Sequence, residues 1–392
     1  MKKTVIALST TLITAVALAQ APHIEPAGDH RHLGEPDNIL FWSPRQKVAG
    51  FRNPQLLFPL RRVASGKRML ALDRHPVALD AVTFRHQGQS LTIDDYFQQF
   101  HTAALLVLHQ GAIVYERYAL GNTRHSVWNG FSVTKSITSM LVGTAIADGH
   151  IASVDEAVTS YLPQLRGSAY DGVSIRHILQ MTSGVGWNED YADPESDINR
   201  IDWRREQFYR YLQASERVAP PGKQFNYSTA ETQLAGDLVR AATGMDLATY
   251  LGDSIWRPFG MEADGWWQLT AADAGEFGGS SLHATLRDFG RLGLFALAGG
   301  RLASGEQMLA PGWMADSVTP SLANPRYGYQ WWLGSDGAFE ASGIFGQSIY
   351  IDPEHHVVIA QHSAREQASD KRDWAAQAAA FRAIVAAVAA TE

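Results

Sequence analysis

The sequence predicts a mixed α/β fold of the α+β type, in which one antiparallel sheet is flanked by helices. Two apolar runs, 103–109 and 112–118, are separated by Gln110-Gly111, which is a hairpin signature. Four further strand-like runs follow near the C-terminus, at 327–333, 339–342, 347–351 and 357–361. The chain between the two groups has mainly helical patterns. We therefore expect both ends of the chain to build one sheet, with a helical lobe inserted between them.

The composition is that of an ordinary globular protein. The chain has 392 residues, of which 45% are hydrophobic, and this is enough to bury one large core or two lobes. The net charge of −7 is mild and the cations are scattered, so no nucleic-acid partner is expected. Cysteine is absent, which excludes a disulfide framework and a thiol nucleophile. No His-Glu-x-x-His or comparable spacing occurs, so we expect no metal and no cofactor.

The first 19 residues have the pattern of a secretory signal peptide. Lys2 and Lys3 precede a mostly apolar stretch, 4–18, and Ala17-Leu18-Ala19 supplies small residues at a cleavage site. The alternative is a transmembrane anchor, but the stretch is shorter than the roughly 20 residues that a span needs. We therefore expect a periplasmic or secreted bacterial protein with no stable membrane anchor after cleavage. Its oligomeric state is not predicted.

Four segments are expected after the signal peptide. Residues 20–90 are rich in Pro, His, Arg and Gly and indicate an extended N-terminal arm. Residues 91–130 and 278–392 are expected to form the lobe that contains the sheet. Residues 131–277 are expected to form the mainly helical lobe, with the active site between the two. Helices are expected at 91–100, 131–148, 175–182, 229–242, 282–298 and 374–389.

Ser132-Val133-Thr134-Lys135 is the motif that carries chemistry. A serine hydroxyl is a weak nucleophile until a base removes its proton. At helical spacing i and i+3, Ser132 and Lys135 share one face, with Cβ atoms about 5–6 Å apart. Lys135 lies in a helix that is apolar on nearly all sides, where an ammonium is costly without a function. The alternative is a capping serine beside a surface lysine.

Two further elements complete the candidate site. Tyr227 lies on a loop directly before a helix, where a phenol near an ammonium can act as a general base or acid. The alternative is a tyrosine that anchors the turn, with Ser228 or Thr229 as N-cap. Ala341-Ser342-Gly343-Ile344-Phe345-Gly346-Gln347 lies at the edge of a predicted strand, and its glycines permit close approach of a ligand, unless they form a bulge. The N–H groups of Ser132 and Ile344 are the predicted oxyanion hole.

As a set, these elements resemble the β-lactamase and penicillin-binding-protein superfamily, whose signature includes a Ser-x-x-Lys helix. The chain is most similar to the class C-like branch, above all to 6-aminohexanoate-dimer (nylon oligomer) hydrolases and related esterases. The similarity runs from about residue 33 to the end and includes 131–136, 188–194, Gln330-Trp331-Trp332 and 343–347. It implies a β-lactamase/DD-peptidase fold. It also implies that Ser132 is the acyl-accepting nucleophile and that Lys135 and Tyr227 share proton transfer.

The resemblance also bears on the substrate. Tyr191 matches a loop tyrosine that closes over the substrate in the nylon-oligomer hydrolases. Trp187, Trp331, Gly343 and Phe345 are further candidates for substrate contact, although tryptophans are more often core residues. Ala341 stands where β-lactamases have Lys or His, and Thr229 stands where class C enzymes have Asn.

These departures favour a hydrolase of linear amides or of esters acting through an acyl-enzyme. The alternatives are a true β-lactamase or D-Ala-D-Ala peptidase, or a catalytically silent binding or sensor domain.

Overall fold

The computed structural model describes residues 28–391, and the predicted signal peptide lies outside them. Within this range, none of the helices combines the length and the apolar character needed to cross a membrane. The segment before the first long hairpin contains three short 3₁₀ helices, at Asp29–His32, Pro36–Phe41 and Pro54–Leu56. Two more lie in the helical lobe, at Val158–Ser160 and Pro163–Leu165.

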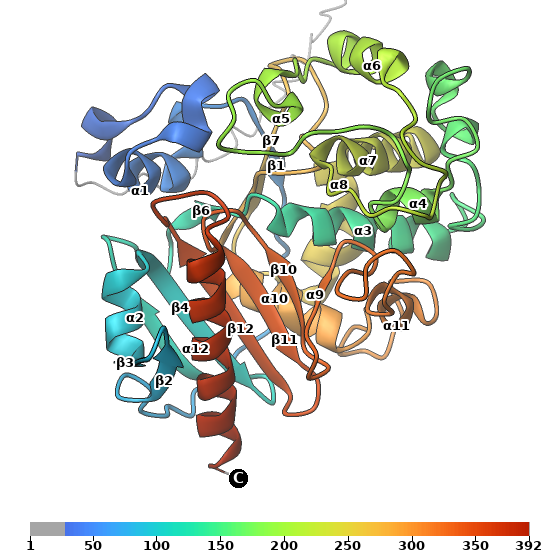
Figure 1. Ribbon diagram of the computed structural model, residues 1–392. Helices are drawn as coiled ribbons and strands as arrows, with labels where there is room; N and C mark the ends of the chain where they lie inside the picture. The colour runs from blue at the N-terminus through green and yellow to red at the C-terminus, as the bar shows by residue number, and fades with distance from the viewer. Residues whose placement is uncertain (1–27, 392) are drawn as a thin grey trace, which may run out of the picture.

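The main sheet has six strands in the order β5-β4-β12-β11-β10-β9, and every neighbouring pair is antiparallel. The hairpin of β4 (Thr102–His109) and β5 (Ala112–Tyr118) comes from the N-terminal part of the chain. It pairs through β4 with β12 (Val357–Ser363), so both ends of the chain build the sheet, as predicted (Figure 1). The other strands are β11 (Ser348–Asp352), β10 (Phe339–Ser342) and β9 (Trp332–Leu333).

Both faces of the sheet are covered, which explains why β4 is apolar without alternation. Leu106 and Leu108 belong to the core on the side of α10 (Leu286–Leu297). Leu105 and Val107 belong to the core on the side of α2 (Ile93–Gln99) and α12 (Lys371–Ala389). Figure 1 shows α12 lying across one face while α10 lies behind the other. A Cβ on Gly293 would lie 2.4 Å from Val358 Cγ1, so glycine permits this close packing of α10.

The expected N-terminal arm contains more regular structure than its composition suggests. α1 (Pro44–Arg52) begins with a capping box between Ser43 and Gln46 and has Pro44 at N1, which are strong start signals. β1 (Leu60–Val63) pairs with β7 (Gly265–Gln268), in a second sheet of order β1-β7-β8-β6. Its other strands are β8 (Leu282–Thr285) and β6 (Val127–Asn129). β2 (Thr83–His86) and β3 (Gln89–Thr92) form a separate hairpin.

The helical lobe is organised around α3 (Val133–Ala147), which is buried over nearly its whole length, as its all-round apolarity predicts. α3 packs on α7 (Thr229–Thr243), which ends at Gly244 in the left-handed conformation. The helix expected at 282–298 begins as β8, because Leu282–Thr285 pairs with neighbouring strands before Thr285 caps α10. The remaining helices are α4 (Ile175–Leu179), α5 (Asp197–Arg200), α6 (Arg205–Ala214), α8 (Leu247–Leu251), the π-helical turn Gly252–Trp256, α9 (Arg257–Phe259) and α11 (Trp313–Ser317).

His362 makes acid stability testable. It is buried on β12 against Trp128 and Phe289, and burial lowers its pKa from 6.5 to about 3. Between pH 6.5 and about 3, this histidine is protonated in the unfolded chain but neutral in the folded chain. The free energy of unfolding therefore decreases as the pH falls through this range. We expect His362→Phe to reduce the slope of unfolding free energy against pH in this window by about 1.4 kcal/mol per unit. Urea unfolding at a series of pH values measures the slope, and an unchanged slope would contradict the assignment.

Candidate active site

Ser132 lies at the N-terminus of α3, directly after a strained residue. Phe131 has a φ of 45°, which is rare for a residue with a bulky side chain. Its N–H donates to Asn129 Oδ1 at 2.8 Å, and its carbonyl accepts from Ser281 N at 3.4 Å. Ser281 itself has a φ of 64°. Asn129 of β6 and Ser281, just before β8, therefore hold the backbone at the start of α3 in a conformation that local preference alone would not choose.

Lys135 lies one turn further along α3 and is 2% exposed. Its Nζ donates to Thr229 Oγ1 at 2.9 Å and to the carbonyl of Gly279 at 2.6 Å. Burial lowers the pKa of Lys135 to about 8, although the charge of Glu189 acts in the opposite direction. A neutral amine has two N–H donors and one lone pair. The two protein acceptors match the two donors, which leaves the lone pair able to accept a proton.

Gly279 has a clear steric requirement. A Cβ on this residue would lie 2.7 Å from the carbonyl oxygen of Thr229, the first residue of α7. Only glycine therefore lets this segment pass close enough to α7 to present its carbonyl to Lys135. No local sequence pattern predicts that Gly279 belongs to the site.

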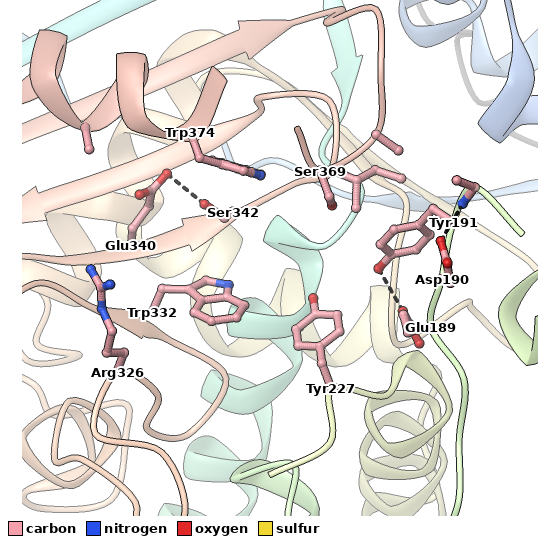
Figure 2. Close-up of a pocket in the computed structure, with 14 residues that line it drawn as sticks. Glu189, Asp190, Tyr191, Tyr227, Arg326, Trp332, Glu340, Ser342, Ser369 and Trp374 are labelled. Carbon is pink, nitrogen blue, oxygen red and sulfur yellow. Dashed lines mark hydrogen bonds between the residues drawn. The ribbon is translucent and has the colours of Figure 1, made fainter. Parts of the chain in front are cut away.

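Tyr227 lies on the loop that leads into α7, and Ser228 is the N-cap of that helix. The Nζ of Lys135 is 5.3 Å from the Tyr227 ring centroid. Burial raises the pKa of Tyr227 well above its usual value, while its side-chain hydrogen bond with Ser132 acts in the opposite direction. The phenol therefore stays protonated at neutral pH. Its ring stacks on Trp332 with centroids 5.7 Å apart, which fixes its orientation (Figure 2).

Ile344 follows β10 in a tight turn. Gly343 N–H donates to the carbonyl of Gln347 at 2.8 Å, and Phe345 N–H donates to Gln347 Oε1 at 3.2 Å. In residues 28–391, neither the N–H of Ile344 nor that of Ser132 has a protein acceptor. Two such donors are what an oxyanion hole requires.

Two cavities of about 650 Å³ each meet at these residues. The first, here the Tyr227 cavity, is also lined by Trp332, Glu340, Arg326 and Trp374 (Figure 2). The second, here the arm cavity, is lined by Ser132, Phe131, Thr229 and residues of the N-terminal arm. Tyr191 and Ile344 line both cavities. A substrate bound across this junction would have its two halves in different cavities.

Glu189 is a site residue that sequence reasoning missed. Its carboxylate accepts hydrogen bonds from Tyr191 OH at 2.8 Å and Thr229 N at 2.9 Å, and also from Thr229 Oγ1 and Trp187 Nε1. It therefore ties the loop of Tyr191 to the start of α7 and orients the hydroxyl that accepts from Lys135. Figure 2 shows the bond to Tyr191 at the edge of the Tyr227 cavity. The contact between the loop of Glu189 and the start of α7 has no local signal in the sequence.

The other candidates for substrate contact lie elsewhere. Trp331 is 1% exposed and packs on Phe339, and the neighbouring Trp332 lines the Tyr227 cavity instead. Phe345 is fully buried, and Trp187 packs against other aromatic rings. A Cβ on Gly343 would lie 2.6 Å from the carbonyl of Gly130, so its role is close packing. None of these four lines either of the two cavities, whereas Tyr191 lines both.

A family model described as Beta-lactamase matches residues 91–382. The chain belongs to this family. A 6-aminohexanoate-dimer hydrolase from Paenarthrobacter ureafaciens is 28% identical over 373 residues, covering 87% of this chain and 91% of the relative. The esterase EstB from Burkholderia gladioli is 33% identical over 142 residues, covering 33% of this chain and 36% of the relative.

The fold of the family is found in solved structures as well. A Bacillus anthracis protein assigned as a 6-aminohexanoate-dimer hydrolase superposes with a TM-score of 0.79. It is 22% identical, and the match covers 87% of this chain and 94% of that protein, which supports the shared fold. The protein is therefore an enzyme of the serine beta-lactamase family with the predicted fold.

The pKa of Lys135 provides a direct test of the site's electrostatics. We expect Lys135 to titrate near pH 8 and to titrate lower in Glu189→Gln, because the substitution removes a negative charge that raises its pKa. Two-dimensional NMR of the Cε signals of labelled lysine measures both values. Lys135→Met assigns the signal, which is necessary because the pKa of Lys47 is also about 8. An unchanged or raised pKa in Glu189→Gln would refute the coupling.

Proposed function

We propose that the protein hydrolyses linear amides or esters through an acyl-enzyme on Ser132. The observation that carries this proposal is the convergence of three groups where two cavities meet. Ser132 lies close enough to Tyr227 for its side chain to lower the Tyr227 pKa, and the Nζ of Lys135 lies over the Tyr227 ring, 5.3 Å from its centroid. A nucleophile, a base of suitable pKa and a protonated acid are thereby within reach of one bound carbonyl group.

In the proposed acylation step, the lone pair of neutral Lys135 accepts the proton of the Ser132 hydroxyl. The serine oxygen attacks the substrate carbonyl, and the N–H groups of Ser132 and Ile344 stabilise the resulting oxyanion. Tyr227 then donates its proton to the leaving nitrogen or oxygen, and the ammonium of Lys135 restores that proton. A water molecule, activated by the same groups, hydrolyses the acyl-enzyme and releases the acid.

This assignment distributes the substrate between the cavities. The acid must face the leaving atom, and Tyr227 lines the Tyr227 cavity, so the leaving group occupies that side. The acyl group, which stays on Ser132, then occupies the arm cavity, which Ser132 lines. Tyr191, at the boundary, lies beside the scissile bond.

Two features favour linear substrates over β-lactams. Ala341 is 1% exposed and has no charge with which to hold a substrate carboxylate. The Thr229 hydroxyl is already bonded to Lys135 and Glu189, so it is not free to hold an acyl amide. Two relatives, a 6-aminohexanoate-dimer hydrolase and an esterase, have names that agree with this choice. Three others are named Beta-lactamase and are 23–25% identical over 41–44% of this chain.

We expect Ser132→Ala to abolish turnover of a short-chain p-nitrophenyl ester and to prevent any acyl adduct. Lys135→Met and Tyr227→Phe should each lower kcat by about 10²–10⁴-fold, because each removes a group that transfers a proton. Stopped-flow kinetics and intact mass spectrometry on the same samples give both readouts.

A panel of linear amides and the chromogenic cephalosporin nitrocefin separates the alternatives. Faster turnover of nitrocefin than of every ester and linear amide would show a β-lactamase. A stable adduct without turnover would show a binding or sensor domain. Ser132→Ala with activity within a few-fold of wild type would remove Ser132 from the mechanism.

We also propose that the protein is exported and that its signal peptide ends at Ala19. The basis is the charge and hydropathy pattern of residues 1–19. Expression of the full chain in a Gram-negative host, followed by intact mass of the periplasmic fraction, should give a mature chain that begins at Gln20. An uncleaved chain in the cytoplasmic fraction would refute export.

A further inference from the structure

The N-terminal arm forms one wall of the arm cavity. Its contribution comes from the 3₁₀ helix Pro36–Phe41 and from the segment just before β1. Apolar residues outside the arm also line the cavity, and they include Tyr191, Ile201, Trp203 and Phe277. Apolar side chains therefore make up much of the lining, and those of the arm are Ile39, Leu40, Leu57 and Phe58. The cavity is also lined by uncharged polar residues, which include Asn199, Gln268, Thr270, Ser280 and Ser281.

The arm is fixed to the body next to the candidate oxyanion hole. Lys47 of α1 is buried, and its Nζ donates to the carbonyls of Arg365 at 3.1 Å and Glu366 at 2.5 Å. Phe51 packs on Phe131 and Phe345 at centroid distances of 4.9 and 5.5 Å. These two rings flank Ser132 and Ile344 in the chain. The arm wall is thus part of the same packed unit as the reacting groups.

The small number of charged residues in the arm cavity favours an uncharged ligand group. Asp37, which is exposed, is the one charged side chain among the described residues that line it. The Tyr227 cavity, by contrast, includes Glu189, Asp190, Glu340 and Arg326. An apolar group gains free energy on entering the arm cavity, whereas a charged group would lose hydration there.

We propose that the arm cavity is the acyl site and that the N-terminal arm makes the enzyme selective for uncharged aliphatic acyl groups of medium length. This inference rests on the proposed function, since it takes Ser132 as the acylated residue. Each methylene buried in the cavity should raise kcat/KM by about fourfold until the cavity is filled.

The test compares p-nitrophenyl acetate, hexanoate and 6-aminohexanoate in the full-length mature protein. For wild type, the ratio of kcat/KM for hexanoate to that for acetate should be at least about tenfold. Leu57→Ala and Leu40→Ala should each lower this ratio by about three- to tenfold, because they remove wall contacts. Ile39→Trp should shift the preferred acyl length downward by filling the cavity.

Leu56→Ala and Phe41→Ala are the matched controls. Both residues belong to the arm and are exposed, at 43% and 52%, and neither lines the cavity. They should leave the ratio within twofold of wild type. Acetate turnover and thermal unfolding of every variant separate a change in selectivity from a loss of fold.

The outcomes distinguish this inference from the proposed function. Acetate hydrolysis with no dependence on acyl length, or equal effects of Leu57→Ala and Leu56→Ala, would overturn the acyl site and leave the serine hydrolase intact. Preference for 6-aminohexanoate over hexanoate, lost in Asp37→Asn, would show that the cavity selects a cation. Absence of any Ser132-dependent turnover or adduct would overturn the proposed function itself.

Discussion

The burial of one amine, that of Lys135, determines how the rest of the site is arranged. An ammonium in the middle of an apolar helix is costly unless neighbouring groups satisfy it. Thr229 and Gly279 supply the two acceptors, and each comes from a different segment of the chain. Because α7 and the 278–281 segment must both approach α3 closely, the loop of Tyr227, which leads into α7, is brought to the same point. The placement of the acid thus follows from the need to satisfy the base.

Electrostatics then separates the roles of two groups that sequence reasoning left shared. Burial lowers the pKa of Lys135 toward neutrality, so a useful fraction of the amine is unprotonated. The same burial raises the pKa of Tyr227, so the phenol holds its proton. Desolvation disfavours the charged form of both groups, and this makes one a base and the other an acid. The negative charge of Glu189 limits how far burial lowers the pKa of Lys135. Glu189 lies on the loop that also positions Tyr191.

The fold contributes rigidity where the chemistry needs it. The sheet is covered on both faces, and its strand β10 ends next to the turn that carries Ile344. Behind this turn, Phe51 of α1 packs against Phe131 and Phe345. A segment far upstream in sequence therefore supports both candidate oxyanion donors. The strained φ of Phe131 persists because these contacts and β6 hold it.

The sequence by itself determined the features that depend on local pattern. The hairpin of β4 and β5, the all-round apolar helix α3, the N-cap of α7 and the juxtaposition of Ser132 and Lys135 all follow from spacing within a few residues. Tertiary structure alone decided the rest. Gly279 accepts a hydrogen bond from Lys135, and the charge of Glu189 acts on the Lys135 pKa. These residues are about 50 to 150 positions from Lys135 in the sequence, so no short sequence pattern predicts the interactions. The sequence does not distinguish Trp331 from Trp332. The packing around β9 buries Trp331, whereas Trp332 lines the Tyr227 cavity. The structure of the N-terminal arm could not be predicted from its sequence for the same reason. Lys47 and Phe51 of the arm contact residues that are distant in the sequence, such as Arg365 and Phe345.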